Sequence, residues 1–492
     1  AEAGTPASGP SPHDHPFSDS LLEGYLQTMS LPEPKGRQRE VVDLPDQGHT
    51  VVLGTAGSGK TTMAILRANY LATLTHQKIL VVTFNRALVT YLKALAAQQQ
   101  LSSFVSVENY HLFARGYLSS RSLLSDNNIV KPDLREQLIK EVLNNLHRQL
   151  QGSRLQNMSA QFFAEESKWI VGSNIQNGAE YARLRGGVGG IAWSEAEGTI
   201  ILKVHQHYRQ LRDQRGFRYD WDDLALAVEE AFTRDNRPRR YHHVVIDEGQ
   251  DFTPAMLRSL VLAIPPEGSL TFFGDMAQQI YGNRISWRTA GLQPPAIYEF
   301  RENYRNSSEI AALAIAMTRT PAFRGVSDLV MPNQIRAKGL PPTLVHCSSS
   351  QVEQQLVVHQ AREAQSRQQS VAILVRKRED ENYYIRQFRQ HQYQRLHRDL
   401  RNWSPKGISI GTYHAAKGLE FDVVLLPRCE ATIIPDPDRL PAFRDQDEAM
   451  SQEARLLYVA ITRARVRLIL TYTNELTALL PDDLKLYQVT RR

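Results

Sequence analysis

The chain has 492 residues, a formal net charge of +6 and an isoelectric point near 9.1. Because one hydrophobic core rarely serves more than about 250–300 residues, this length predicts several structural units. No apolar run approaches the roughly 18 residues of a membrane helix, so we expect no membrane partner. The chain has only two cysteines, Cys347 and Cys429, without metal-ligand spacing, so the sequence suggests neither a disulfide framework nor a zinc or iron–sulfur site, and a reducing cytoplasm fits best. The positive charge agrees with a polyanionic partner but identifies none.

The predicted elements follow an α/β rhythm after a tail at residues 1–20 that is rich in Pro, Ser, Gly and His and is expected to be disordered. Short β-branched runs, expected as strands, alternate with helical stretches; the runs lie at residues 50–53, 79–84, 243–246 and 270–273. The pattern changes to long helices at 118–218, and a second α/β rhythm follows, with strands expected at 370–375, 407–412 and 422–426 and a helix at 453–463. The fold class is therefore α/β, with two P-loop-type parallel sheets and a mostly helical insertion.

The expected domain borders follow from these changes of pattern. The first α/β unit takes two segments, the insertion separates them, and the second α/β unit completes the chain. In order, the segments are 21–117, 118–218, 219–300 and 301–492.

A glycine-rich loop follows the first expected strand and precedes a helical stretch, the context that a P-loop requires. Its backbone N–H groups would face the phosphates of ATP, Lys60 would reach the β- and γ-phosphates, and the Thr61 hydroxyl would bind Mg²⁺. A chance glycine turn rarely has both flanking elements. The candidate nucleotide contacts are Gly54, Ala56, Gly57, Ser58, Gly59, Lys60, Thr61 and Thr62.

Two adjacent carboxylates, Asp247 and Glu248, end another apolar strand. Asp247 is a candidate for the metal and Glu248 for the general base that activates the attacking water. An acid-rich helix start would give a similar local pattern, but the neighbouring P-loop favours catalysis. After the strand at 270–273, Gln278 is a candidate sensor of the γ-phosphate, although taken alone such a residue is more often a solvated loop amide.

The order of these elements resembles the UvrD/Rep-like superfamily 1 helicases, from Gln38 to about residue 465. Gln38 looks like the adenine-reading Q motif, and the run from Asp247 to Asp251 matches the DExQD signature. Further segments are similar to motifs Ia, Ib, III, IV, V and VI of that family, at residues 83–88, 109–111, 274–281, 302–305, 412–421 and 458–464.

This resemblance implies an ATP-dependent translocase or helicase on single-stranded or partly duplex DNA, moving 3′ to 5′ and hydrolysing ATP between two RecA-like domains. It also implies that Tyr304 stacks on adenine and that Arg305 and Arg463 reach the γ-phosphate from the second domain. A guanidinium there can neutralise charge that develops on the phosphoryl oxygens. Glu420, in the segment similar to motif V, is a further expected nucleotide contact.

A single-strand track is expected where aromatic side chains alternate with cations, because bases stack on π-faces while phosphates need positive charge. Each aromatic candidate could equally be a half-buried packing residue. The candidates are Phe84, Arg86, Tyr110, His111, Tyr281, Trp287 and His414.

The sequence departs from the large family members in the short interval between Arg305 and Thr412, from which we infer that the accessory domain called 2B is absent or vestigial. The compact length is similar to the helicase-like subunit of Gabija-type phage-defence systems. One alternative is therefore a DNA-stimulated ATPase switch that regulates a partner nuclease or other effector in defence or repair. Another is an RNA motor of the Upf1-like branch. No segment resembles a RecB-like nuclease.

Overall fold

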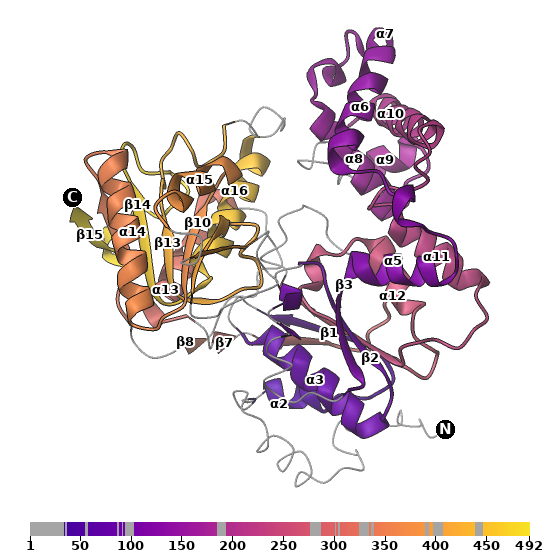
Figure 1. Ribbon diagram of the computed structural model, residues 1–492, viewed down its shortest axis with the longest axis horizontal. Helices are drawn as coiled ribbons and strands as arrows, with labels where there is room; N and C mark the ends of the chain where they lie inside the picture. Colours follow the sequence, from indigo (N-terminus) through magenta and orange to yellow (C-terminus); the bar gives the residue numbers. More distant parts are fainter. Residues whose placement is uncertain are drawn as a thin grey trace, which may run out of the picture.

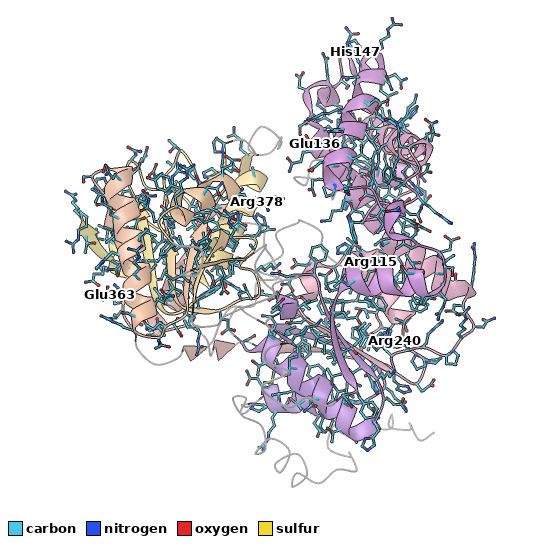
Figure 2. All side chains as sticks on the ribbon, viewed as in Figure 1. Arg115, Glu136, His147, Arg240, Glu363 and Arg378 are labelled. Carbon is cyan, nitrogen blue, oxygen red and sulfur yellow. The ribbon has the colours of Figure 1, made fainter. Side chains whose placement is uncertain are left out.

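The computed structural model describes residues 34, 37–54, 58–85, 88–90, 92–93, 103–184, 193–275, 287–300, 302–303, 306–323, 334–335, 339–388, 393–396, 407–437 and 446–492. Figure 1 shows two parts that each contain a sheet, lying side by side, and a column of helices that stands on the first of them. In Figure 2, Glu136 and His147 mark this column, while Glu363 and Arg378 mark the second part. The two parallel α/β sheets expected from the sequence are confirmed.

The first sheet has six strands in the order β3-β2-β4-β5-β1-β6, and every pairing in it is parallel. Strands β2, β4 and β5 are buried along their whole length, as expected for a sheet that helices cover on both faces. The strands are β1 (Gly48–Gly54), β2 (Ile79–Thr83), β3 (Val105–Asn109), β4 (His243–Ile246), β5 (Ser269–Gly274) and β6 (Ile297–Phe300).

Successive strand residues pack on opposite faces of this sheet. Val51 and Val244 join the core under helices α5 (Tyr110–Ser120), α11 (Leu224–Arg234) and α12 (Pro254–Val261). Val52 and Val245 join the core under α2 (Arg37–Val42) and α3 (Lys60–Thr75). This period of two follows from strand geometry. Parallel pairing places the carboxyl ends of β1, β4 and β5 at one edge of the sheet.

The helical column has its own hydrophobic core, which includes Trp169, Tyr181, Trp193 and Tyr208. The Ser194 side chain and Glu197 form a capping box that starts its longest helix, α10. Helix α5, which ends at Ser120, packs with the first sheet rather than with this column. The column consists of α6 (Pro132–Asn145), α7 (His147–Leu150), α8 (Ala160–Ser173), α9 (Gly178–Leu184) and α10 (Glu195–Gln214).

The second sheet has seven strands in the order β11-β12-β10-β13-β14-β9-β15, again all parallel. A two-stranded pair, β7 (Glu302–Asn303) with β8 (Gln334–Ile335), lies near the junction with the first part (Figure 1). The seven strands are β9 (Thr343–His346), β10 (Val371–Val375), β11 (Tyr393–Arg395), β12 (Ile408–Thr412), β13 (Phe421–Leu426), β14 (Ala464–Tyr472) and β15 (Gln488–Arg491).

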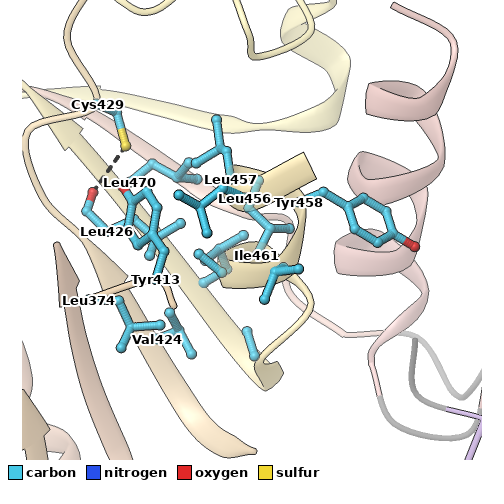
Figure 3. Close-up of a cluster of buried hydrophobic side chains, with 14 of the residues drawn as sticks. Leu374, Tyr413, Val424, Leu426, Cys429, Leu456, Leu457, Tyr458, Ile461 and Leu470 are labelled. Atoms are coloured by element: carbon cyan, nitrogen blue, oxygen red, sulfur yellow. Dashed lines mark hydrogen bonds between the residues drawn. The ribbon is translucent and has the colours of Figure 1, made fainter. Parts of the chain in front are cut away.

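Helices α13 (Ser308–Thr318) and α16 (Gln446–Ile461) pack on one face of this sheet, and α14 (Ser350–Ser366) and α15 (Arg378–Ile385) on the other. Figure 3 shows the first of these cores, in which leucines of α16 pack against Tyr413 and the strands. Both cysteines are buried and free, and the Cys429 thiol donates to the Leu426 carbonyl 3.3 Å away. Within the residues described, no helix is long and apolar enough to cross a bilayer.

Candidate active site at the junction of the two sheets

The glycine-rich loop joins β1 to α3, as the sequence predicts. Gly59 has a φ of 83°, the left-handed region that glycine adopts without strain, and it leads directly into α3 at Lys60. The Lys60 ammonium donates to the Gly54 carbonyl at 2.8 Å and lies 3.5 Å from the Asp275 carboxylate. A side chain at position 54 could not fit, because its Cβ would lie 2.5 Å from the Ser58 hydroxyl.

Gln38, in α2, contacts this loop. Its side-chain amide donates to the Ser58 carbonyl at 2.7 Å, and both residues are buried. A Cβ at position 59 would come within 2.9 Å of the same amide. Thr61 is buried at the start of α3 and Thr62 is half-buried beside it. Gln38 therefore holds Ser58 and Gly59 in place ahead of α3.

Asp247 follows β4 at the edge where the strand ends meet. It is only 1% exposed, and neither of its carboxylate oxygens has a hydrogen-bond partner. Burial and then the nearby Glu248 charge raise the pKa of Asp247 to about 7, although Thr61 and Lys60 act in the opposite direction. A buried carboxylate without partners is costly unless a cation joins it. Asp247 and Thr61 thus fit a Mg²⁺ site with oxygen ligands.

Glu248 has a φ of 53°, which is unusual for a residue with a Cβ and is the kind of local strain found at functional sites. Its carboxylate accepts a hydrogen bond from the Gln250 amide. Burial raises the pKa of Glu248, but the positive charges of Lys417, Lys60 and Arg463 outweigh burial and hold that pKa below its ordinary value. These charges favour the ionised form of Glu248, the form that a general base requires.

Two of these charges come from the second α/β part. Arg463 is fully buried after α16, where its guanidinium donates to the carbonyls of Val459 at 2.9 Å and Leu419 at 3.4 Å. Lys417 follows β12 and forms an ion pair with Asp251 of the first part. Glu420 is half-buried near the start of β13. The structure thus brings Lys60, Glu248 and Arg463 together from sequence positions far apart.

A second group of candidates surrounds Phe84, at the end of β2. The Phe84 ring lies 5.3 Å from His111, and His111 lies 5.7 Å from Trp221, both edge-on. The Lys168 ammonium, from α8 in the helical column, sits 5.6 Å from the Phe84 ring. Phe84, His111 and Trp221 are all half-buried, so one side of this aromatic cluster remains accessible.

Tyr110 requires a correction. The sequence predicts that Tyr110 contacts the nucleic acid, but its side chain is completely buried under α12 and its hydroxyl forms a hydrogen bond with the Ser259 hydroxyl at 2.7 Å. The first residue of α5 points inward, so a base could reach Tyr110 only by opening the core. Trp287 is half-buried and packs edge-on against Phe272 at 5.1 Å, and His414 is half-buried beside Lys417.

Several predicted residues lie outside the described part of the chain, and sequence reasoning also missed some that the structure brings in. Those outside the description are Ala56, Gly57, Arg86, Gln278, Tyr281, Tyr304 and Arg305. The missed residues are those with charged or aromatic contacts to the site: Lys168, Trp221, Asp251, Asp275 and Lys417. Asp251, Asp275 and Lys417 lie inside the predicted motifs, which was the available signal.

Comparison with known sequences agrees with this geometry. The UvrD/REP helicase N-terminal domain matches residues 35–304, and the UvrD-like helicase C-terminal domain matches residues 392–475. The chain belongs to the UvrD/Rep helicase family. The resemblance inferred from the motifs is therefore confirmed at the level of the family.

Individual relatives of this UvrD/Rep family member are distant. A probable DNA helicase of Mycoplasma pneumoniae is 25% identical, covering 86% of this chain and 80% of the relative. DNA helicase IV of Escherichia coli is 21% identical, covering 94% and 72%. The putative ATP-dependent DNA helicase YjcD of Bacillus subtilis is 23% identical over 59% of this chain and 37% of its own length, so the chain spans well under half of that relative.

Proposed function

We propose that the protein is an ATP-driven motor on single-stranded DNA that hydrolyses ATP at the junction of its two α/β parts. The observation that carries the proposal is the surroundings of Glu248, a buried carboxylate kept ionised by Lys60 from the first part and by Lys417 and Arg463 from the second. A base that depends on charges from both parts ties hydrolysis to their relative position. Such dependence is what a motor needs to convert chemistry into movement.

In this proposal each residue has a distinct task. The loop from Gly54 to Thr61 binds the phosphates, and Lys60 holds the β- and γ-phosphates. Asp247 and Thr61 hold Mg²⁺, which when bound neutralises phosphate charge. Glu248 orients the attacking water and takes its proton.

Charge that develops on the γ-phosphate is neutralised from the second part. Arg463 is already buried close enough to lower the pKa of Glu248. Arg305 is the second proposed guanidinium, Gln278 the proposed sensor, and Tyr304 with Gln38 the proposed adenine contacts. Glu420 completes the proposed nucleotide set.

The DNA is proposed to cross the aromatic cluster at Phe84, His111 and Trp221. By the same proposal, the first sheet with its two segments is a RecA-like domain 1A, the helical column is a 1B domain, and the second sheet is a RecA-like domain 2A. Stacking on accessible rings, with Lys168 beside them, supports a single-stranded substrate. The proposed direction is 3′ to 5′.

Directional movement is tested with single-stranded DNA that carries biotin at one end and is blocked with streptavidin. The proposal expects ATP-dependent displacement from the 5′ end, where a 3′-to-5′ motor arrives, and little from the 3′ end. Equal displacement from both ends contradicts directional movement. Single-stranded RNA of the same sequence, added as competitor, separates a DNA motor from an RNA motor.

One observation favours a second candidate function, an ATPase switch that controls a partner nuclease or other effector. Among the residues described between 306 and 412, helices α13, α14 and α15 all pack on the second sheet, so none of these helices belongs to a separate unit like the column. A motor without a second accessory domain could sense DNA without separating strands. A forked duplex decides between the two, because the switch hydrolyses ATP on the fork and leaves it paired.

A further inference from the structure

The turn at Lys417 and Gly418 in the second α/β part contacts the first part at three points. The Lys417 ammonium forms an ion pair with Asp251, and the Lys417 carbonyl accepts a hydrogen bond from the Asn85 amide at 2.6 Å. The next residue, Gly418, has a φ of 79°, and a Cβ there would lie 2.9 Å from Leu88. These contacts connect the turn at residues 417–418 to Asn85, Leu88 and Asp251 of the first part.

Asp251, which pairs with Lys417, lies in the turn next to the proposed catalytic carboxylate of Glu248. Asp251 ends the single turn Gly249–Asp251 that follows Glu248, and its backbone N–H donates to the Glu248 carbonyl at 3.0 Å. The side chains of Lys417 and Asp251 are only 7% and 6% exposed. A buried ion pair is sensitive to geometry, because separating its partners leaves two charges without water.

Asn85, which contacts Lys417, lies next to the proposed DNA-binding site at Phe84. Asn85 is the neighbour of Phe84, and the Phe84 carbonyl accepts a hydrogen bond from Asn109. Lys168, which lies over the Phe84 ring, also exerts its charge on Asp251. Asp251 and Lys417 therefore stand between the aromatic cluster and Glu248, with contacts toward both.

We propose that Lys417 is a positioning residue that couples strand binding at Phe84 to ATP hydrolysis at Glu248, through its ion pair with Asp251 and its hydrogen bond with Asn85. A strand that stacks on Phe84 stabilises the turn at residues 84–85, which holds Lys417 against Asp251 and thereby fixes the turn that carries Glu248. This inference rests on the proposed function, in which the Lys417 charge already acts on Glu248. It adds a connection from Lys417 to the proposed DNA site at Phe84 through Asn85. The coupling is reciprocal, as for any pair of linked sites.

The test measures ATP hydrolysis with and without a 30-nucleotide oligo-dT in the full chain and its variants. Lys417→Met and Asp251→Asn are expected to lower the DNA stimulation ratio roughly tenfold, within the range of typical coupling between sites. The affinity for oligo-dT and the KM for ATP are expected to change less than about threefold, because neither residue is proposed to contact a ligand. Lys417→Arg is expected to keep most of the stimulation.

A matched control is the buried ion pair between Arg376 and Glu453, which lies entirely within the second part. Glu453→Gln is expected to lower thermal stability while leaving the stimulation ratio at the wild-type value. If Lys417→Met and Asp251→Asn behave like this control, or if Lys417→Arg loses as much stimulation as Lys417→Met, the coupling role is wrong. If the wild-type chain itself shows no DNA-stimulated hydrolysis, the proposed function fails instead, so the two failures are distinguishable.

Discussion

The Lys60 ammonium is held between the Gly54 carbonyl at 2.8 Å and the Asp275 carboxylate at 3.5 Å. Two strand ends therefore hold this cation, because Gly54 ends β1 and Asp275 follows β5. The Lys60 charge is thus ordered by the sheet before any ligand contact, which is the condition for strong electrostatic stabilisation of the phosphates that we propose it binds.

Replacing Lys60 with Ala is expected to lower the kcat for DNA-stimulated ATP hydrolysis by roughly 10²–10³, the usual loss for one preorganised donor. The measurement is steady-state phosphate release with saturating oligo-dT. Lys485, an exposed lysine far along the chain, provides the control as Lys485→Ala. A Lys60→Ala variant that hydrolyses ATP like this control contradicts the assignment of the loop.

Asp247→Asn is expected to change stability and activity in opposite directions. Without Mg²⁺, the amide removes a buried charge that lacks partners and lies beside Glu248, so the melting temperature should rise. The Mg²⁺ concentration that gives half-maximal hydrolysis should rise roughly tenfold, because a ligand oxygen with charge is lost. Differential scanning fluorimetry with EDTA and a Mg²⁺ titration of hydrolysis test both. A fall in melting temperature with unchanged Mg²⁺ dependence contradicts a metal role.

Substitutions in the aromatic cluster are expected to weaken DNA binding, whereas substitution of Tyr110 is not. Phe84→Ala and Trp221→Ala are each expected to weaken oligo-dT binding by about 1–3 kcal/mol, the range for one stacked base. Tyr110→Phe removes the hydrogen bond to Ser259 and should cost about 1 kcal/mol of folding stability without changing DNA affinity. Fluorescence anisotropy and urea unfolding give the two quantities. If Tyr110→Phe weakens oligo-dT binding, Tyr110 contacts the DNA, as its position in the motif predicts.

Two buried histidines predict loss of stability in acid. Burial lowers the pKa of His205 and of His243 to about 4, from ordinary values near 6.5. The unfolded chain therefore binds protons that the folded chain refuses, so stability falls progressively as the pH drops from about 6.5 to about 4. His243→Gln, which keeps a polar group near Ser269, should flatten this dependence in urea unfolding at several pH values. An equally steep dependence in the variant rules out His243 as a contributor.

The extent of sequence-based prediction differed between local and long-range features. The strand expected at 243–246 is observed as His243–Ile246, and the loop before Lys60 was predictable because strand, glycines and helix are adjacent in the chain. Hydrophobic periodicity does not reveal which distant segments meet. The approach of Lys168 to Phe84 depends on the fold of the helical column, and the pairing of Lys417 with Asp251 depends on how two separate sheets dock.

Tyr110 shows why motif position alone can mislead. It is the first residue of α5, and its neighbour His111 faces the aromatic cluster. One residue of rotation on a helix turns a side chain by about 100°, so adjacent motif residues can face core and solvent. Only packing against α12 decides which one is buried.

We propose that Glu248 is the base for ATP hydrolysis driven by single-stranded DNA. The most direct measurement is ATP hydrolysis by wild type, Glu248→Gln and the exposed-surface control Glu267→Gln, each with and without oligo-dT. We predict strong stimulation in wild type and Glu267→Gln, and a loss of roughly 10² or more in Glu248→Gln with DNA binding retained. Stimulated hydrolysis in Glu248→Gln at the wild-type rate would contradict the account.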